Sequence, residues 1–391
     1  MNEKKGIFER WSKYKLEDLV EIDPDQLSNS TNRDFEFKYI DLSSVNAGKI
    51  NYPSSTIKFK NSPSRARKVI IDGDILMSTV RPNLKGFAKF NQIDKVQYIA
   101  STGFAVLREK EIADIDFIYQ ILFSDSIEKQ IQNLVVGSNY PSINTRSVRN
   151  LEIFAPNKHE QSKIAQILTT CDKVIEQTEA VIAKYKAIKQ GMLHDLFTRG
   201  LDKNGKLRPT PTEAPELYKK SELGLIPKDW EVMQLRKFAI IHNGIDYKNN
   251  PNGDMVPIYG TGGILGYTSM TLNHGPAVLS GRKGSINSPY YVEGDFWNVD
   301  TIFCIKTINN NTKWLYYAIE QIDMMKYSEA TGVPSITSKT LYNIYFSVPS
   351  HQEQIYIVNY ISSIENKIQT EEIVLKKYIA IKVGLMKRLL R

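Results

Sequence analysis

Two stretches of the chain decide the fold: residues 158–199 (KHEQSKIAQILTTCDKVIEQTEAVIAKYKAIKQGMLHDLFTR) and residues 351–391 (HQEQIYIVNYISSIENKIQTEEIVLKKYIAIKVGLMKRLLR). In both, seam residues recur at alternating steps of four and three, the pattern of long helices that pair side by side. Polar residues interrupt both seams at the same two places, a feature that typically fixes register. We therefore predict two long paired helices whose seams include Ile164, Leu168, Ile175, Ile182 and Tyr185, and Ile357, Ile361, Ile368, Leu375 and Tyr378.

The two helices belong to an internal duplication of the whole chain. Tyr140-Pro141-Ser142-Ile143 reappears as Val333-Pro334-Ser335-Ile336, an offset of 193 residues between Pro141 and Pro334. The same offset relates Gln161 to Gln354 and holds as far as Leu196 and Leu389. Only two copies exist, which excludes a solenoid and indicates a pseudo-twofold protein.

The segments that precede each helix are different in character. They contain short β-branched runs bounded by Gly, Asn or Pro, such as DFEFKYIDL and GPAVLSG, and these runs predict strands and turns in compact mixed domains. Four prolines between the halves predict an extended linker. We expect a mixed α/β (α+β) fold with a first domain at 1–157, a first helix at 158–199, a linker at 200–229, a second domain at 230–350 and a second helix at 351–391.

Charge is distributed unevenly along the 391 residues, which carry a formal net charge of +8. Residues 58–90 hold eight cations and two anions, whereas residues 230–350 hold nine charges of each sign. A basic stripe admits a nucleic-acid partner, although a solvated surface explains it equally well. The two cysteines form no disulfide framework, and no stretch is apolar enough for a signal peptide or a membrane span. We expect a cytoplasmic protein without membrane contact.

Catalytic signatures are weak throughout the sequence. Residues 287–290 (NSPY) resemble the loop with which adenine methyltransferases hold their target, but no Gly-rich nucleotide turn accompanies them. Asp25, Glu36 and Lys38 match the acidic-acidic-lysine pattern of metal-dependent nucleases, a short pattern that is common by chance. The five histidines are scattered and no phosphate-cradling loop is present. We therefore predict no catalytic residue, no metal site and no cofactor bound by this chain.

Matched turns in the two halves suit contact with DNA. In each half a strand-like run delivers cations and small polar groups into a turn, where Arg can pair with guanine through two hydrogen bonds. A second pair of matched turns precedes each long helix. The predicted DNA-binding residues are, in the first half, Arg65, Arg67, Lys68, Arg81, Asn83, Lys85, Asn139, Tyr140, Ser142 and Arg146, and in the second half, Tyr259, Thr261, Arg282, Lys283, Ser285, Thr331, Ser335 and Lys339.

Taken together, these features resemble the specificity (S) subunits of type I restriction-modification systems, the HsdS family. The resemblance covers essentially the whole chain, and its most specific parts are PSIN…LEIFAPNKHEQSKIAQIL and its echo PSIT…VPSHQEQIYIVNYI. It implies two target recognition domains held apart by an antiparallel coiled coil, each reading half of a bipartite site in double-stranded DNA. It also implies two methyltransferase (M) subunits and two restriction/translocase (R) subunits as partners, which use S-adenosylmethionine, ATP and Mg²⁺.

Two hypotheses from other classes compete with this one. The first is an autonomous nuclease that uses Asp25, Glu36 and Lys38. The second is a coiled-coil interaction protein with no nucleic-acid role, for which changes at Arg81 and Arg282 would leave every activity untouched.

Overall fold

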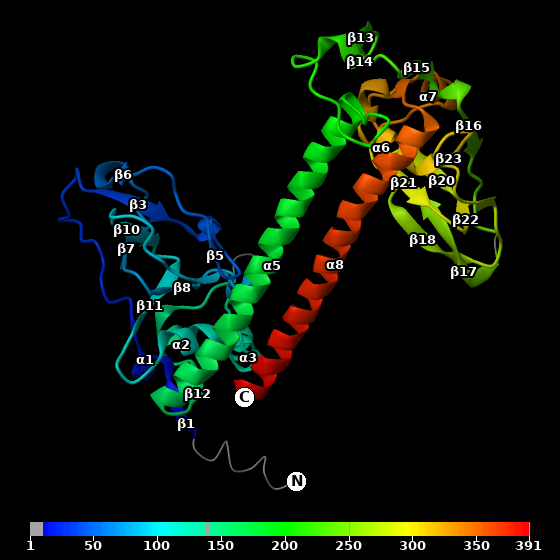
Figure 1. The fold of residues 1–391 in the computed structure, drawn as a ribbon. Helices are drawn as coiled ribbons and strands as arrows, with labels where there is room; N and C mark the ends of the chain where they lie inside the picture. The colour runs from blue at the N-terminus through cyan, green and yellow to red at the C-terminus, as the bar shows by residue number, and fades with distance from the viewer. Residues whose placement is uncertain (1–10, 138–140, 250, 391) are drawn as a thin grey trace. The chain divides into compact units, whose positions relative to one another are not determined.

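The computed structural model describes residues 11–137, 141–249 and 251–390 (Figure 1). The chain divides into two compact units, and each division falls inside a long helix. Unit 1 comprises residues 1–179 and 374–391, and unit 2 comprises residues 180–373. No helix of the described ranges is long and apolar enough to cross a membrane.

Unit 1 is built on two four-stranded sheets. The first has the order β2-β11-β8-β9, with β2 (Val20–Ile22), β11 (Phe104–Glu109), β8 (Ile75–Ser78) and β9 (Phe87–Lys89). The second has the order β6-β3-β10-β7, with β6 (Ile57–Lys58), β3 (Glu36–Ile40), β10 (Tyr98–Ser101) and β7 (Ala66–Ile70). Smaller elements complete the unit: β1 (Ser12–Lys15) paired with β12 (Glu152–Ala155), the hairpin β4 (Val45–Asn46) and β5 (Lys49–Ile50), and helices α1 (Leu16–Leu19), α2 (Ile115–Ile121), α3 (Asp125–Leu134) and α4 (Thr145–Arg149).

Unit 2 repeats this topology. Its first sheet has the order β16-β23-β20-β21, with β16 (Ala239–Asn243), β23 (Ile302–Thr307), β20 (Ala277–Gly281) and β21 (Tyr290–Val292). Its second has the order β18-β17-β22-β19, with β18 (Gly263–Thr268), β17 (Asn252–Gly260), β22 (Asp295–Asn298) and β19 (Asn273–His274). The remaining elements are β15 (Glu231–Gln234) paired with β24 (Tyr345–Val348), the hairpin β13 (Tyr218–Ser221) and β14 (Gly224–Pro227), and helices α6 (Thr312–Glu320) and α7 (Ser338–Tyr342).

The correspondence between the units extends to strand direction. One pair in each second sheet is parallel, β3 with β10 in unit 1 and β17 with β22 in unit 2. The domains therefore share a scaffold even where their sequences differ, which extends the duplication beyond the stretches where it is visible in the sequence.

The long helices are α5 (Lys158–Thr198) and α8 (His351–Leu389). In unit 2, Lys186 Nζ lies 2.7 Å from Glu372 Oε1 and Lys189 Nζ lies 2.8 Å from Glu365 Oε1, so residue numbers rise along one helix as they fall along the other. The helices are therefore antiparallel. Each helix begins inside a domain core: Ile164 and Leu168 are buried in the core of unit 1, and Ile357 and Ile361 are buried in that of unit 2.

Burial varies along the predicted seam. Ile182 and Ile368 are also buried, whereas Ile175, Tyr185 and Leu375 are half-buried. Tyr378 departs from the prediction, because its side chain is 37% exposed. A tyrosine tolerates this position because its hydroxyl can face water while its ring covers the helix.

A buried glutamine attaches each long helix to its own domain. Gln161 accepts a hydrogen bond from the backbone nitrogen of Asp114, the N-cap of α2, at 2.9 Å. Gln354, its counterpart in the duplication, accepts one from the backbone nitrogen of Asn311, the N-cap of α6, at 2.8 Å. Both amide groups also donate to a proline carbonyl five residues earlier. The duplication therefore preserves the joint between domain and helix in both units.

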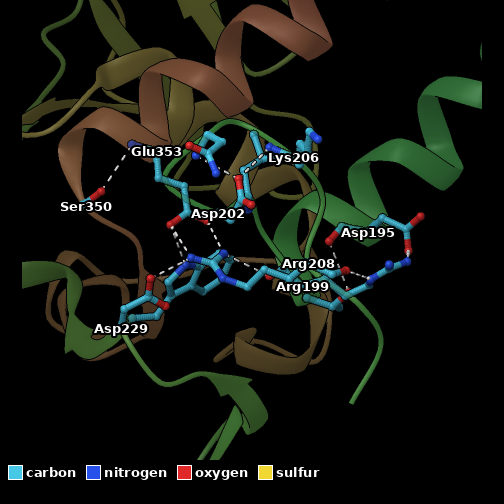
Figure 2. Close-up of polar contacts among 12 residues, drawn as sticks. Asp195, Arg199, Asp202, Lys206, Arg208, Asp229, Ser350 and Glu353 are labelled. Atoms are coloured by element: carbon cyan, nitrogen blue, oxygen red, sulfur yellow. Dashed lines mark hydrogen bonds and ion pairs between the residues drawn. The ribbon is translucent and has the colours of Figure 1, made fainter. Parts of the chain in front are cut away.

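The linker is folded onto unit 2, in contrast to the extended segment that its prolines predict. Arg208 is buried and its Nη1 lies 2.6 Å from Glu353 Oε1, at the start of α8 (Figure 2). Glu353 also accepts hydrogen bonds from Leu201 N at 2.7 Å and from Trp230 Nε1 at 3.1 Å. We call these four residues the linker clasp. The prolines prevent a helix, but they do not prevent this compact attachment.

A second duplicated contact ties the two helices together. Asp172 and Lys382 form an ion pair in unit 1 with Oδ1 and Nζ 2.5 Å apart, and the same positions of the duplication hold Glu365 and Lys189 in unit 2. Each carboxylate also accepts a hydrogen bond from its own domain, from Gln120 Nε2 or from the hydroxyl of Tyr317. These lysines are polar interruptions of the predicted seam.

We expect the coupling energy between Asp172 and Lys382 to be about 1 kcal/mol, since the pair is partly exposed to water. A double-mutant cycle with Asp172→Ala and Lys382→Ala, followed by urea unfolding, measures it. Lys186 and Glu372 provide a more exposed reference pair, for which a smaller coupling is expected. Strictly additive effects at Asp172 and Lys382 would show that the pair does not stabilise helix pairing.

Candidate nucleic-acid interface

In unit 1, the turn after β8 meets the turn before α4. The backbone nitrogen of Arg81 donates to the carbonyl of Pro141 at 2.6 Å, and Ile143 N donates to Thr79 O at 2.9 Å. Ser142 forms a β-bridge with Val80. Arg81 adopts the left-handed region at φ 48°, which turns the chain sharply and leaves its side chain exposed.

We call the place where these two turns meet the junction of the unit. Unit 2 contains a corresponding junction. Gly284 N donates to Pro334 O at 2.8 Å, and Ile336 N donates to Arg282 O at 3.0 Å. Lys283 and Ser335 form the β-bridge that corresponds to Val80 and Ser142. The two turns that are matched across the duplication in the sequence therefore lie together within each unit.

A third turn joins the junction of unit 2. It is the tip of the β17–β18 hairpin, where Thr261 Oγ1 lies 3.5 Å from the point that a Cβ on Gly284 would occupy. Thr261 O also accepts a hydrogen bond from the hydroxyl of Tyr290 at 3.1 Å. The rings of Tyr259 and Tyr290 lie 6.3 Å apart between centroids, and burial raises the pKa of Tyr259. Tyr259 is half-buried and packs below the hairpin tip, whereas Thr261 lies at the tip itself.

The corresponding connection in unit 1 links β3 to β6 and contains the β4–β5 hairpin. It forms one side of a cleft of about 890 Å³ at the junction of that unit. The cleft is lined by Leu42, Ser43, Val45, Asn46, Arg65, Ser78, Val80, Arg81, Leu84, Gly86 and Ser142. Arg65, Arg81 and Ser142 were predicted from the sequence, whereas the residues of the connection were not, because the connections of the two units differ in length and share no motif.

The basic stripe at residues 58–90 is largely neutralised in the fold, in contrast to the cationic surface that its sequence predicts. Five of its eight cations form ion pairs with carboxylates: Lys58, Lys60, Lys68, Lys85 and Lys89. Their partners lie in other parts of unit 1 and include Asp34, Asp23, Glu128 and Asp116. The stripe in the sequence is therefore not a basic stripe on the surface.

Three predicted contact residues are engaged inside unit 1. Lys68 is 5% exposed and its Nζ lies 2.6 Å from Asp23 Oδ2, so it cannot reach DNA in this structure. Lys85 Nζ lies 2.8 Å from Glu128 Oε2. The guanidinium of Arg67 lies over the ring of Phe59 at 4.9 Å and donates to the carbonyl of Ala66. Lys68 is removed from the candidate site, and Lys85 and Arg67 have internal partners that DNA would have to displace.

Most other candidates are exposed. The Cζ atom of Arg282 lies 5.9 Å from the ring centroid of Phe303, and its Nη1 donates to the carbonyl of Asp300 at 3.4 Å. Ser335 is half-buried. Asn139 and Tyr140 fall outside the described residues. The exposed positions are Arg65, Arg81, Asn83, Ser142, Arg146, Arg282, Lys283, Ser285, Thr331 and Lys339, while Thr261 is half-buried.

The nuclease pattern does not assemble. Asp25 Oδ2 lies 2.5 Å from Arg108 Nη1, and Lys38 Nζ lies 2.7 Å from Asp94 Oδ2. Glu36 is exposed, and its Oε1 lies 3.9 Å from Lys58 Nζ. A metal site requires carboxylates that converge on one point. Within the part of the chain that the structure describes, no group of three His, Cys, Asp or Glu side chains could hold a metal ion.

The fold and the junctions define a class of protein: two homologous mixed domains, each with three turns on one junction, joined through antiparallel helices. The family model described as type I restriction modification DNA specificity domain matches residues 9–186 and 227–379. The chain belongs to this family, whose two matched regions coincide with the two copies of the duplication.

Individual relatives agree with this assignment. The chain is 24% identical over 294 residues to the type I restriction enzyme MjaVIII specificity subunit of Methanocaldococcus jannaschii, covering 67% of this chain and 66% of the relative. It is 28% identical over 195 residues to the HindI specificity subunit of Haemophilus influenzae, covering 48% and 40%. The chain thus spans less than two thirds of the length of these curated relatives.

The fold also matches a solved structure. The S subunit of a type I restriction-modification system from M. genitalium superposes with a TM-score of 0.63 at 16% identity, covering 97% of this chain and 96% of that one. At this identity the likeness supports the fold alone.

Proposed function

We propose that this chain is the DNA-recognition subunit of a type I restriction-modification enzyme and that it reads a bipartite site in double-stranded DNA without catalysing a reaction. Each unit reads one half-site with the turns at its junction, and the antiparallel helices set the unread gap. The observation that carries the proposal is the repeated junction, where corresponding turns meet through corresponding hydrogen bonds in both units. Turns of this kind reach phosphates and base edges.

The partners follow from the same proposal. Two methyltransferase subunits and two restriction/translocase subunits assemble on this chain, and they use S-adenosylmethionine, ATP and Mg²⁺. The chain itself binds none of these cofactors. The duplication supports a pair of equivalent partners, because it repeats the joint between helix and domain through Gln161 and Gln354.

A genome-wide map of methylated adenines tests the proposal in cells that co-express this chain with its cognate methyltransferase subunit. We expect a split motif, with two short defined halves around a fixed run of unspecified bases, because two separate junctions read separate half-sites. Arg282→Ala should relax one half and leave the other intact. A continuous motif, or no methylation from a stable complex, would contradict the proposal.

A further inference from the structure

Two side chains in the cleft of unit 1 have the chemistry for reading bases and have no hydrogen-bond or ion-pair partner among the residues that the structure describes. Asn46 and Arg65 both line the cleft and are both exposed. Neither side chain forms a hydrogen bond or ion pair with another residue of the described ranges. This separates Arg65 from Arg67, Lys68 and Lys85, whose charged groups are engaged.

Asn46 stands on a hairpin that is fixed from several sides. Ala47 and Gly48 both have positive φ, at 40° and 92°, which forms the tight two-residue connection between β4 and β5. Gly48 N donates to Phe87 O at 2.8 Å, and Lys49 Nζ lies 2.6 Å from Glu179 Oε2 on α5. The hairpin therefore presents Asn46 from a rigid support, although its side chain remains available.

The other end of the connection is also fixed. Asp41 accepts hydrogen bonds from Ser43 Oγ, Ser44 Oγ and Ser44 N, between 2.8 and 2.9 Å. Partial burial raises the pKa of Asp41, but these hydrogen bonds lower it by more, so its pKa lies below its usual value. An ionised Asp41 thus holds the 3₁₀ turn Leu42–Ser44 that forms this side of the cleft.

Arg65 stands immediately before β7. Its carbonyl accepts a hydrogen bond from Thr102 N at 2.8 Å, and Ala66 N donates to Pro63 O at 2.9 Å. The backbone of Arg65 is therefore held by neighbouring segments, while its guanidinium has no partner within the described part of the chain. A preorganised backbone reduces the entropy that a side chain loses when it binds.

We propose that the cleft of unit 1 reads base edges in the major groove, with Arg65 pairing with a guanine and Asn46 pairing with an adenine of the same half-site. Arg matches the O6 and N7 acceptors of guanine through two hydrogen bonds, and the Asn amide matches N6 and N7 of adenine. This inference rests on the proposed function and deepens it, because it assigns a base class to two residues of one unit. The Arg65 and Asn46 side chains are the specificity determinants.

The decisive variant is Arg65→Lys, which keeps the charge but removes the planar fork of donors. Binding of the full complex with the methyltransferase subunit is measured on duplexes that carry each single base-pair change in both half-sites. We expect discrimination at one G·C pair of one half-site to fall by about 5- to 150-fold, with the other half-site unaffected. Asn46→Asp should cause a comparable loss at an A·T pair of the same half-site, since it removes the amide donor.

Arg33→Ala is the matched control, because Arg33 is an exposed arginine of unit 1 outside the cleft. It should leave every base preference unchanged. If the Arg65→Lys complex discriminated between base pairs as well as the parent, or bound all sequences more weakly by the same factor, Arg65 would be a phosphate contact. Either result would overturn the inference. If the unaltered complex recognised no split site, the proposed function itself would fail, which is a separate result. Thermal unfolding of each variant should match the parent, because both positions are exposed.

Discussion

Replacing Arg208 by alanine should destabilise unit 2 by about 3–5 kcal/mol, because it leaves the carboxylate of Glu353 buried without its charged partner. The side chains of Arg208 and Glu353 are 7% and 6% exposed, so the Glu353 carboxylate is largely shielded from bulk water. Burial lowers the pKa of Arg208, but the hydrogen bonds and charges of Glu353 and Asp229 together raise it by more, so its pKa lies above its ordinary value. Since a guanidinium is not deprotonated in proteins, the pair is broken only by removing one of its partners.

The residues around the linker clasp are packed too tightly for the chain to rearrange easily after Arg208 is lost. Figure 2 shows Arg208 reaching across from the linker toward Glu353 and Asp229, and its Nη2 lies 2.7 Å from Asp229 Oδ2. Gly200 has φ 61°, and a Cβ there would lie 2.3 Å from Glu353 Oε1 and from Trp230. The chain is thus packed around the clasp at its backbone as well as at its side chains.

Thermal and urea unfolding measure the effect of Arg208→Ala. The unfolding temperature should fall by roughly 10 °C for a unit of this size. Lys206→Ala is the matched control, because Lys206 is an exposed cation in the same loop, and its removal should change stability by less than about 0.5 kcal/mol. If both variants unfolded at the parent temperature, the linker would be a loose tether, as its prolines predict.

The sequence alone predicted the features that depend on repetition and period. The helix seams, the family resemblance and the pairing of turns across the duplication all follow from residues at fixed spacings, such as Pro141 and Pro334. These features were accessible because each is recorded twice, or every three to four residues, in one chain.

Features that depend on distant partners were not accessible. The partner of Arg208 is 145 residues away and that of Lys68 is 45 residues away, so neither ion pair leaves a local pattern. The same reason explains why the basic stripe at residues 58–90 was misjudged. Its charges can be counted in the sequence, but the carboxylates that neutralise them lie in other segments. Asn46 was missed because only the fold brings the β4–β5 hairpin beside Arg65 and Arg81.

Lys68 distinguishes between two explanations of the basic stripe at residues 58–90: a DNA-binding surface, or cations that form ion pairs inside the domain. Its Nζ lies 2.6 Å from Asp23 Oδ2 and also donates to the carbonyl of Phe104, while Asp23 Oδ1 accepts a hydrogen bond from Val106 N at 2.9 Å. The Lys68 and Asp23 side chains are 6% and 7% exposed. The lysine therefore fastens the turn at Asp23 to β11 and belongs to the interior of the domain.

Lys68→Met should accordingly cost about 3–5 kcal/mol of stability, since methionine fills the volume but leaves the Asp23 carboxylate buried and unpaired. Its neighbour in the stripe supplies the contrast: Arg65→Ala should keep the unfolding temperature within the error of the measurement, because Arg65 is exposed, and yet alter base preference. Unfolding by urea and the methylation map together distinguish the two. If Lys68→Met kept its stability and lost one half-site, the stripe would act at the surface after all, and the buried ion pair would not describe the protein in solution.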